Sequence, residues 1–386
     1  MKSRFIILFL SIIFFGFNSQ NSFAQKSIEV KGIVLDEFNN PIPFAAISIL
    51  KKNRGTSSTE DGEFSLKITS SELEDMLSFT SLGFNPFKIK IKDYLAQAEK
   101  KIVLKETVFE MDEITIVAPK TYVINALKKL KDNTLSKPHQ IELLYRRAAT
   151  EGGKSKFFVE NYIKIRDRGP ASPLGIVEVT ESRKSADYRI WKRKQWTHDI
   201  NWMITANPLR PTDRTPNLKK YKWEITGETS YEGEEVLIFE GTGKNKWDKV
   251  KLYIGVDSYG VFRIERNKAI MVYKRHENGK LYLSYYANEW GLGRKQIPQK
   301  YWNTDAEEMS YRLEAFVYKV ETDKKKIDVN AFGGDTDMGS LDLPYNAEFW
   351  KNLSMPPDTK FFKQIKKELE GNFGVPLEVQ YNLANQ

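Results

Sequence analysis

The sequence predicts a mainly β protein with some α-helix: a small β-sandwich followed by a larger curved antiparallel sheet with flanking helices. Three observations support this fold class. Short runs with an apolar residue at every second position recur along most of the chain. Turn dipeptides such as Asp61-Gly62 and Asn278-Gly279 separate these runs. Apolar residues at helical spacing occupy only two stretches, 119–133 and 358–370.

The first 24 residues have the pattern of a signal peptide. Lys2 and Arg4 precede an apolar run, 5–17, that is too short to span a bilayer. Small residues then stand at the two positions that a signal peptidase reads, Ser22 and Ala24. We predict cleavage after Ala24 and export. An uncleaved anchor helix is the alternative, but polar residues interrupt the apolar run before Ser22.

Composition excludes several classes of site. The 386 residues include no cysteine, so the chain has no disulfide, thiolate zinc site, thiol nucleophile or lipid-modified cysteine. The formal net charge is +9, with basic clusters at 189–194 and 219–222. In an exported chain we interpret these clusters as solvated surface and expect no nucleic acid partner. Weak attraction to an anionic membrane surface or to an acidic polymer is the alternative interpretation.

Residues 26–106 are predicted to form the sandwich. The first strand covers 28–35 and the second 44–50. The Asp61-Gly62 turn predicts a hairpin that leads into a strand on which Phe64, Leu66 and Ile68 share one buried face. About seven short strands separated by turn signals are typical of a β-sandwich.

Four motifs in this region carry a family resemblance. They are GIVLD at 32–36, PIPFAAI at 41–47, TEDGEFSL at 59–66 and SFTSLGF at 78–84. Together they resemble the carboxypeptidase-like regulatory domain, a module common in exported and outer-membrane proteins of Bacteroidetes-type bacteria. The resemblance implies a transthyretin-like sandwich with no catalytic residues of its own.

We interpret residues 107–118 as a linker strand. This acidic and then β-branched stretch resembles the segment that follows such domains in TonB-dependent transporters, where it can contact the energy-transducing partner. A transporter would need a barrel of about 22 strands, and the rest of the 386-residue chain is too short for one.

Residues 119–386 are predicted to form an α+β domain around a curved antiparallel sheet. Pro119 suits the first turn of a helix. Asn278-Gly279 favours a type I′ hairpin, and Asp358 is the predicted cap of a last helix that stops at Gly371. The predicted elements are a helix at 119–133, strands at 141–147, 156–165 and 175–179, a proline-rich loop at 206–217 and a meander of strands from 223 to 320.

This second part carries two further resemblances. Segments 127–133, 144–147, 231–240 and 345–350 are similar to the uncharacterised partner domain of exported Bacteroidetes proteins that carry the regulatory domain. The pattern KLYIGVD at 251–257 also resembles a strand of the half-barrel of periplasmic lipoprotein carriers. The second resemblance implies a curved sheet that can hold an apolar ligand.

One motif suggests a metal site. His139 and Glu142 form an H-x-x-E, which supplies two zinc ligands in zinc carboxypeptidases, and His276 is available as a third. In two-domain carboxypeptidases, however, the catalytic domain precedes the regulatory module. Here the module comes first, and the rest of the chain is rich in strands rather than alternating α and β. We therefore predict no zinc site.

Two other groups of residues were weighed as sites. Gly333-Gly334-Asp335-Thr336-Asp337, with Asp342, offers oxygen ligands for calcium but lacks the remaining positions of a known motif, so we interpret it as a surface turn. Tryptophans can stack on sugars or lie at a membrane interface, but we expect these to fill the core or line a groove. They are Trp191, Trp196, Trp202, Trp223, Trp247 and Trp290.

The sequence therefore predicts a protein that is not an enzyme, with no catalytic, cofactor-binding or metal residue. We expect an exported, non-catalytic binding or assembly component of the cell envelope, in the periplasm or in peripheral contact with the outer membrane. Its expected partner is an envelope protein or an apolar ligand. One alternative is a carrier of lipid, which requires a concavity of at least a few hundred Å³. The other is a zinc carboxypeptidase-like hydrolase, which requires a pocket that gathers His139, Glu142 and a further ligand.

Overall fold

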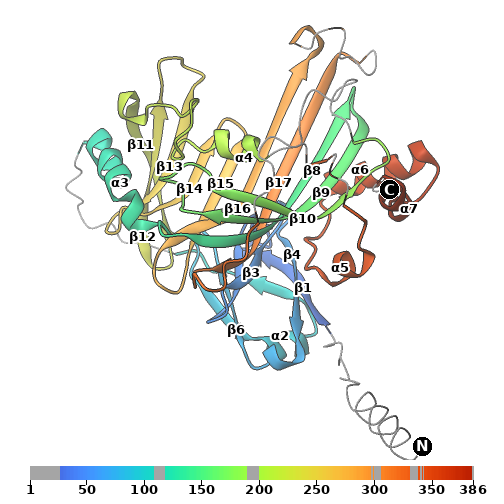
Figure 1. Cartoon of the computed structure of the whole chain (residues 1–386). Coiled ribbons are helices and arrows are strands. Elements are labelled where there is room, and N and C mark those ends of the chain that lie inside the picture. Colours follow the sequence, from blue (N-terminus) through green and yellow to red (C-terminus); the bar gives the residue numbers. More distant parts are fainter. Residues whose placement is uncertain are drawn as a thin grey trace, which may run out of the picture.

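The computed structural model describes residues 27–107, 118–188, 200–296, 299, 306–330, 338–339, 341 and 343–384. The fold class is confirmed: strands dominate, and a small sandwich accompanies a large curled antiparallel sheet with a few helices (Figure 1). The predicted signal peptide and most of the predicted linker strand lie outside the described residues.

Seven short strands and one helix build the sandwich. One sheet has β1 (Ser27–Leu35) between β4 (Glu63–Thr69) and β7 (Lys101–Val103). The other has the order β3 (Arg54–Ser57), β2 (Ala46–Ile49), β5 (Met76–Thr80) and β6 (Phe87–Lys90). The predicted alternation on β4 is confirmed, because Phe64, Leu66 and Ile68 are all buried in the sandwich core.

The Asp61-Gly62 turn is real, but the predicted hairpin is wrong. Gly62 has φ +75°, a conformation that glycine adopts without strain. The strands on either side, β3 and β4, belong to different sheets, so the turn carries the chain from one layer of the sandwich to the other. The Ser58 hydroxyl donates to the carbonyl of Ile42 (2.9 Å), which keeps the end of β3 beside the chain that enters β2.

The alternation of Phe87, Ile89 and Ile91 predicts a strand that includes Ile91, but the strand in the structure is shorter. β6 ends at Lys90, and Ile91 begins a short helix, α2 (Ile91–Ala96). This helix buries Tyr94, whose hydroxyl donates to the Lys31 carbonyl (2.9 Å). A strand that continued past Lys90 would turn this ring away from the core.

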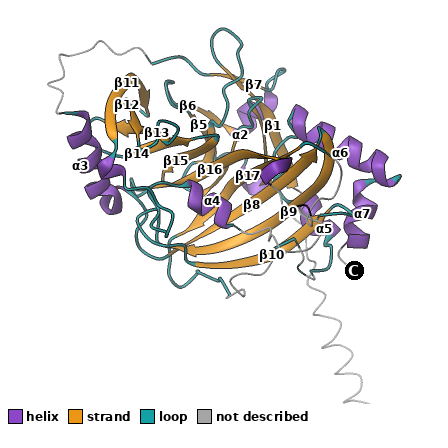
Figure 2. Cartoon of the chain, turned by 90° about the horizontal axis from the view of Figure 1, so that it is seen from above, coloured by secondary structure: helices purple, strands orange, loops and turns teal. Residues whose placement is uncertain are grey.

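The larger sheet has ten strands that curl around one face (Figure 2). Neighbouring strands pair antiparallel throughout. In spatial order they are β11 (Lys222–Tyr231), β12 (Glu234–Thr242), β13 (Lys249–Gly255), β14 (Val261–Arg266), β15 (Ala269–Arg275), β16 (Leu281–Gly293), β17 (Glu308–Glu321), β8 (His139–Glu151), β9 (Lys154–Asp167) and β10 (Ile176–Lys184). The last strand of the meander, β17, thus closes on the earlier strand β8.

The β15–β16 hairpin is confirmed, but its turn type is not the predicted one. Type I′ requires positive φ at both central residues, and of the two only Gly279 has it (φ +79°). The amide of His276 donates to the Lys280 carbonyl (2.8 Å), and the amide of Gly279 donates to the His276 carbonyl (2.8 Å). This is a three-residue loop that ends in a left-handed glycine.

Both faces of the larger sheet are buried. Successive side chains of β8 and β9 point alternately to the concave and the convex face. Leu143 and Val159 belong to the core of the concave face, whereas Leu144 and Phe158 belong to clusters on the convex face. A sheet that is apolar on both faces must be covered on both.

The convex face is covered by the sandwich and by three C-terminal helices, α5 (Ala347–Asn352), α6 (Lys360–Phe373) and α7 (Leu377–Ala384). The sandwich joins the larger sheet directly, because β3 pairs with β17 at Arg54 and Lys319, beyond the point where β16 leaves β17. Phe44 of the sandwich stacks on Tyr285 of β16 with 4.6 Å between the ring centroids.

The boundaries of the last long helix differ from the prediction. Thr359, not Asp358, caps α6: its hydroxyl accepts from the Phe362 amide. Asp358 instead pairs with Lys366 (2.8 Å). The helix continues through Gly371 and ends at Gly374, which has the left-handed conformation of a C-terminal cap.

Two helices contact the core of the concave face. The predicted helix is confirmed as α3 (Pro119–Asn133), which lies at the β11–β14 end of the sheet (Figures 1 and 2). Its Tyr122 stacks on Phe239 and Tyr259. α4 (Asn201–Ala206) lies over the middle of the sheet (Figure 2). In the described part of the chain, every helix is too short or too polar to cross a membrane.

Candidate functional site

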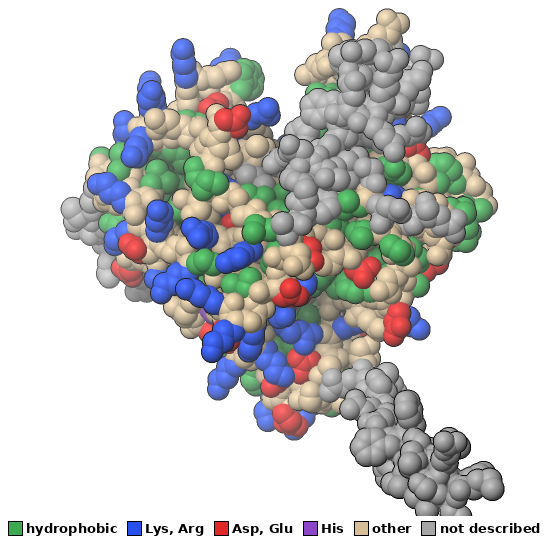
Figure 3. Space-filling model, viewed as in Figure 1, with side chains coloured by type: hydrophobic (Ala, Val, Ile, Leu, Met, Phe, Trp, Pro, Cys, Tyr) green, Lys and Arg blue, Asp and Glu red, His purple; other side chains and the backbone are tan. Residues whose placement is uncertain are grey.

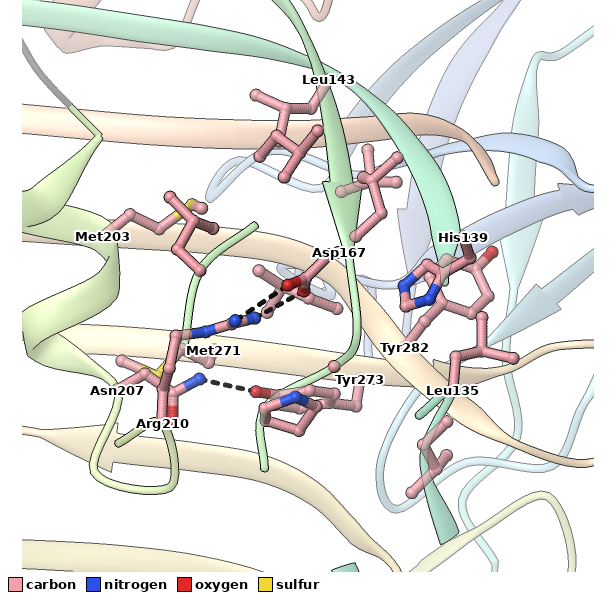
Figure 4. Close-up of a pocket in the computed structure, with 18 residues that line it drawn as sticks. Leu135, His139, Leu143, Asp167, Met203, Asn207, Arg210, Met271, Tyr273 and Tyr282 are labelled. Atoms are coloured by element: carbon pink, nitrogen blue, oxygen red, sulfur yellow. Dashed lines mark hydrogen bonds and ion pairs between the residues drawn. The ribbon is translucent and has the colours of Figure 1, made fainter. Parts of the chain in front are cut away.

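The concave face of the larger sheet holds the candidate site (Figure 4). Its floor comes from β8, β9, β15, β16 and β17, and its cover from residues 200–217, which we call the covering segment. The apolar lining consists of Leu135, Ile141, Leu143, Ile165, Leu174, Met203, Met271, Leu281, Leu283 and Val317, and the polar lining includes His139, Asp167, Asn207, Arg210, Tyr273 and Tyr282.

Strand alternation explains the apolar floor. Ile141 and Leu143 are two apart on β8, so both point to the concave face. Ile165 on β9 and Met271 on β15 reach the same cavity from either side. The floor is therefore built from several separate strands, and no single sequence motif encodes it.

A buried ion pair fixes the covering segment to the sheet. Arg210 Nη1 and Nη2 donate to Asp167 Oδ1 (2.9 Å) and Oδ2 (2.7 Å), and Nη1 also donates to the Ser172 carbonyl (3.0 Å). The Asp167 side chain is 3% exposed and that of Arg210 11%. Burial acts to lower the pKa of Arg210, but the Asp167 carboxylate outweighs it and raises this pKa above its usual value. The guanidinium of Arg210 therefore stays charged.

A second polar contact reinforces the cover. Asn207 Nδ2 donates to the Tyr273 hydroxyl (2.8 Å), while Asn207 Oδ1 accepts from the Leu209 amide (3.0 Å). Burial raises the pKa of Tyr273 to about 12, so the phenol stays neutral. Figure 4 shows this contact beside the ion pair, and together they connect the covering segment to β9 and β15.

The cavity beneath the cover is small. Its volume is about 30 Å³, enough for about one water molecule. Pockets that bind small molecules usually hold about 300 Å³ or more. Ile200, Met203 and Leu209 are buried in the core of the concave face and occupy the remaining space. The concavity required of a lipid carrier is therefore closed while the covering segment is in place.

The structure separates the residues of the H-x-x-E motif. His139 and Glu142 lie three apart on β8 and so point to opposite faces. His139 lines the concave cavity, where Nδ1 lies 2.9 Å from the Lys137 carbonyl and burial lowers its pKa. Glu142 accepts from Tyr162 (2.8 Å) and Lys319 (3.0 Å) on the convex face.

The third candidate zinc ligand, His276, does not line this cavity. His276 lines a different pocket, between the sandwich and the larger sheet. Within the described ranges no group of three histidine, aspartate or glutamate side chains could hold a metal ion. The pocket required of the hydrolase alternative is therefore not formed by His139, Glu142 and His276.

The structure describes only some of the candidate calcium ligands and tryptophans. Gly333-Gly334-Asp335-Thr336-Asp337, Asp342, Trp191 and Trp196 lie outside the described residues, and of Trp202 only the backbone is described. Trp223 is buried, and Trp290 stacks on Tyr311 with 4.8 Å between centroids. Trp247 differs, because it is 74% exposed in the turn between β12 and β13.

Sequence reasoning missed a buried ionic network on the convex face. Glu160 is fully buried and accepts from Arg146 Nε (2.8 Å) and Arg183 Nε (2.5 Å). Asp358 extends the network with a 3.4 Å contact to Arg146. Burial acts to raise the pKa of Glu160, but the guanidinium groups of Arg183 and Arg146 lower it to about 2. The network fixes the start of α6 to the sheet.

Comparison with known proteins finds a family match for the N-terminal part. Residues 30–116 match the family model of the CarboxypepD_reg-like domain. The sandwich is a CarboxypepD_reg-like domain. This confirms the resemblance carried by the motifs between 32 and 84, and the matched range extends ten residues beyond Glu106 (116 − 106).

One curated relative is the TonB-dependent receptor SusC of Bacteroides thetaiotaomicron. It is 27% identical over 141 residues, which is 35% of this chain but only 13% of the receptor. The chain thus spans about an eighth of the length of that relative, and the receptor's activity is not transferred to it.

Solved structures with similarity to this chain have low TM-scores. A LolA superfamily protein from Nitrosomonas europaea is 15% identical, with TM-score 0.27 and coverage of 56% of this chain and 99% of the other. A DUF1329 family protein from Desulfovibrio piger is 10% identical, with TM-score 0.27 and coverage of 55% and 96%. A lipoprotein-sorting protein domain from Vibrio parahaemolyticus is 9% identical, with TM-score 0.30 and coverage of 54% and 95%. No function is transferred from them.

Proposed function

We propose that this protein is an exported, non-catalytic binding component of the cell envelope, and that the concave face of its larger sheet binds one apolar chain. The observation that carries the proposal is an apolar floor formed by five strands and covered by a segment outside the sheet. The predicted export signal at 1–24 and the CarboxypepD_reg-like domain support the envelope location.

Binding requires the covering segment to move. Apolar side chains make up most of the cavity lining, whereas the closed cavity holds only about 30 Å³. An incoming alkyl chain would take the place of Met203 and Leu209, so the ligand would restore the apolar packing that these side chains give up. Burial of apolar surface contributes about 25 cal/mol per Å², which drives such an exchange.

The contacts of the covering segment suit a reversible cover. It has no ladder of backbone hydrogen bonds to the sheet, since none of the described strand pairs includes residues 200–217. Side-chain contacts at Asn207 and Arg210 hold it instead. When the segment moves, Asp167 and Arg210 can each return to water, and their hydration offsets part of the attraction between them.

A single-cysteine reporter tests the proposal, because the native chain has no cysteine. In Met203→Cys the thiol lies on the cavity side of the covering segment, where the native residue is 7% exposed. We expect a long-chain fatty acid such as oleate to raise the rate of thiol modification about tenfold or more, since local opening controls access.

Two further reporters make this test specific. Asp213→Cys is exposed in the same segment and should react at the same rate with and without oleate. Ala45→Cys, buried in the sandwich, should stay unreactive unless the fatty acid unfolds the protein. An unchanged rate at Met203→Cys, or an increase shared by Ala45→Cys, would contradict the proposal.

A further inference from the structure

A second hollow lies on the convex side, where the sandwich meets the larger sheet. Its volume is about 230 Å³. In Figure 3, Lys and Arg side chains gather on the surface where the sandwich adjoins the larger body. The sandwich contributes Ser48, Ile49, Leu50, Lys51, Asn53, Arg54, Ser78 and Thr80, and the sheet side contributes Glu232, Lys274, Arg275, His276, Glu277 and Tyr282. We call this hollow the junction pocket.

Lys274 is a buried ammonium in the wall of the junction pocket. The residue is 5% exposed, and its Nζ donates to Ser48 Oγ (3.0 Å), across the boundary between the two bodies. The Tyr282 ring lies 5.3 Å from Nζ. Within the described residues no carboxylate lies within 4.0 Å of it. A buried cation usually has an anionic partner, because a hydroxyl and a ring compensate only part of its lost hydration.

His276 adds a second donor. Its Nδ1 accepts from the Asn278 amide (3.3 Å), so the ring proton is carried on Nε2. Nε2 is buried and makes no hydrogen bond to any described residue. The junction pocket therefore has an N–H donor without a partner in addition to the ammonium of Lys274.

The acidic residues in the wall do not neutralise this site. Glu232 is engaged by Arg275 Nε (3.4 Å), and Arg275 also pairs with Glu234. Arg54 is engaged by Glu72 (2.7 Å). After these pairs are formed, the wall keeps the positive charges of Lys274 and the exposed Lys51 and the negative charge of the exposed Glu277.

An apolar hollow of about 190 Å³ adjoins the junction pocket. Val272 lines it two residues before Lys274 on β15, and Ala46 lines it two residues before Ser48 on β2. Residues two apart on a strand share a face, so the hollows are neighbours along both strands, and Thr80 borders both. Phe44 and Phe84 add aromatic surface to the apolar hollow.

We propose that the junction pocket binds a small molecule with one oxyanion group, a phosphate or a carboxylate, and that a small apolar group of this molecule lies beside Val272 and Phe44. Lys274 supplies the charge, and the Nε2–H of His276 together with the hydroxyls of Ser48, Ser78 and Thr80 supplies hydrogen-bond partners. This site goes beyond the apolar-chain function, because it lies on the opposite face of the sheet and uses polar recognition.

Calorimetric titration of the full mature chain with phenyl phosphate, inorganic phosphate and acetate tests the site. We expect phenyl phosphate to bind several-fold more tightly than inorganic phosphate, because its ring can bury apolar surface. Lys274→Met should weaken phenyl phosphate binding about tenfold or more, since it removes a charge-assisted hydrogen bond while keeping the length of the side chain. Acetate tells whether the site takes carboxylates as well as phosphates.

The matched control is Lys268→Met, which removes the same charge from the exposed turn at the other end of β15. It should leave the affinity within about twofold. If circular dichroism shows that Lys274→Met does not fold, His276→Phe replaces it, with an expected loss of about threefold or more. The absence of binding by all three anions, or equal affinities in wild type and the Lys274 or His276 variant, would overturn the proposal.

Discussion

At the scale of single residues, the Asp167–Arg210 pair is one of the contacts that hold the covering segment over the concave face. Both side chains are largely buried and bond through two hydrogen bonds. Removing one partner leaves the other charge buried without compensation, which in proteins costs about 3 kcal/mol. We therefore expect Arg210→Met to lower the free energy of unfolding by about 3 kcal/mol in chemical denaturation.

The double variant Asp167→Leu/Arg210→Met tests whether the unpaired buried charge causes this loss of stability. Replacing both charges by apolar groups should recover most of the loss, because no unpaired charge remains. Arg214→Met, at an exposed position of the same segment, should change stability by no more than about 0.5 kcal/mol. If Arg210→Met is as stable as Arg214→Met, the ion pair does not hold the cover.

The lowered pKa of Glu160 predicts that the free energy of unfolding depends on pH. Its pKa in the folded chain is about 2, below the ordinary 4.5. A lowered carboxyl pKa contributes stability above 4.5, and this contribution is lost as pH falls from 4.5 towards 2. The stability difference between wild type and Glu160→Gln should therefore be about 3 kcal/mol at pH 6 and shrink steadily below pH 4.5. A difference that stays constant with pH would show that Glu160 is not held ionised by Arg146 and Arg183.

These residue-scale features could not be predicted from sequence. Asp167 and Arg210 lie 43 positions apart, and the three members of the Glu160 network lie on three strands. Only tertiary pairing brings such charges together. Conversely, His139 and Glu142 are close in sequence but point to opposite faces of one strand, so their short spacing does not place them in one site.

At the scale of elements, two glycines near the end of α6 should respond in opposite directions. Gly371 lies inside the helix, and an added Cβ would meet nothing within 4 Å. Gly371→Ala should raise the free energy of unfolding by about 0.8 kcal/mol, because alanine is the better helix former. Gly374 has φ +65°, where a side chain is strained.

Gly374→Ala should accordingly lower the free energy of unfolding by about 1 kcal/mol. Chemical denaturation of the two variants compares them directly. If Gly371→Ala were destabilising and Gly374→Ala neutral, α6 would end where the sequence predicted, at Gly371, and not where the structure has it.

Helices and strands were predicted correctly where a local spacing of apolar residues specifies them. The apolar spacing of residues 119–133 and the alternation from Phe64 to Ile68 each encode one element, and both are confirmed. α5 and α7 were not predicted, because they are short and their aromatic residues pack against distant strands. The closure of β17 on β8 is a long-range pairing that no local signal specifies.

At the scale of the whole molecule, the sandwich and the larger sheet behave as one folded body. Their boundary includes the β3–β17 pairing, the Lys274–Ser48 bond and the stacking of Phe44 on Tyr285. Phe44→Ala should lower the free energy of unfolding by about 2 kcal/mol, roughly half the cost of removing a fully buried phenylalanine.

Phe38→Ala is the matched control, because Phe38 is 76% exposed on the sandwich and should contribute less than about 0.5 kcal/mol. Differential scanning calorimetry gives the decisive comparison. If Phe44→Ala shifts the melting of only one body, the two units unfold independently. The structure predicts a shared transition that moves to lower temperature as a whole.

The central claim is that the concave face accepts one apolar chain. Native mass spectrometry of the mature protein, released gently from the cell envelope, tests it most directly. We expect a mass increment of one small apolar-chain molecule, which organic extraction removes. A stoichiometric polypeptide in place of such a molecule, or the bare chain alone, would contradict the claim.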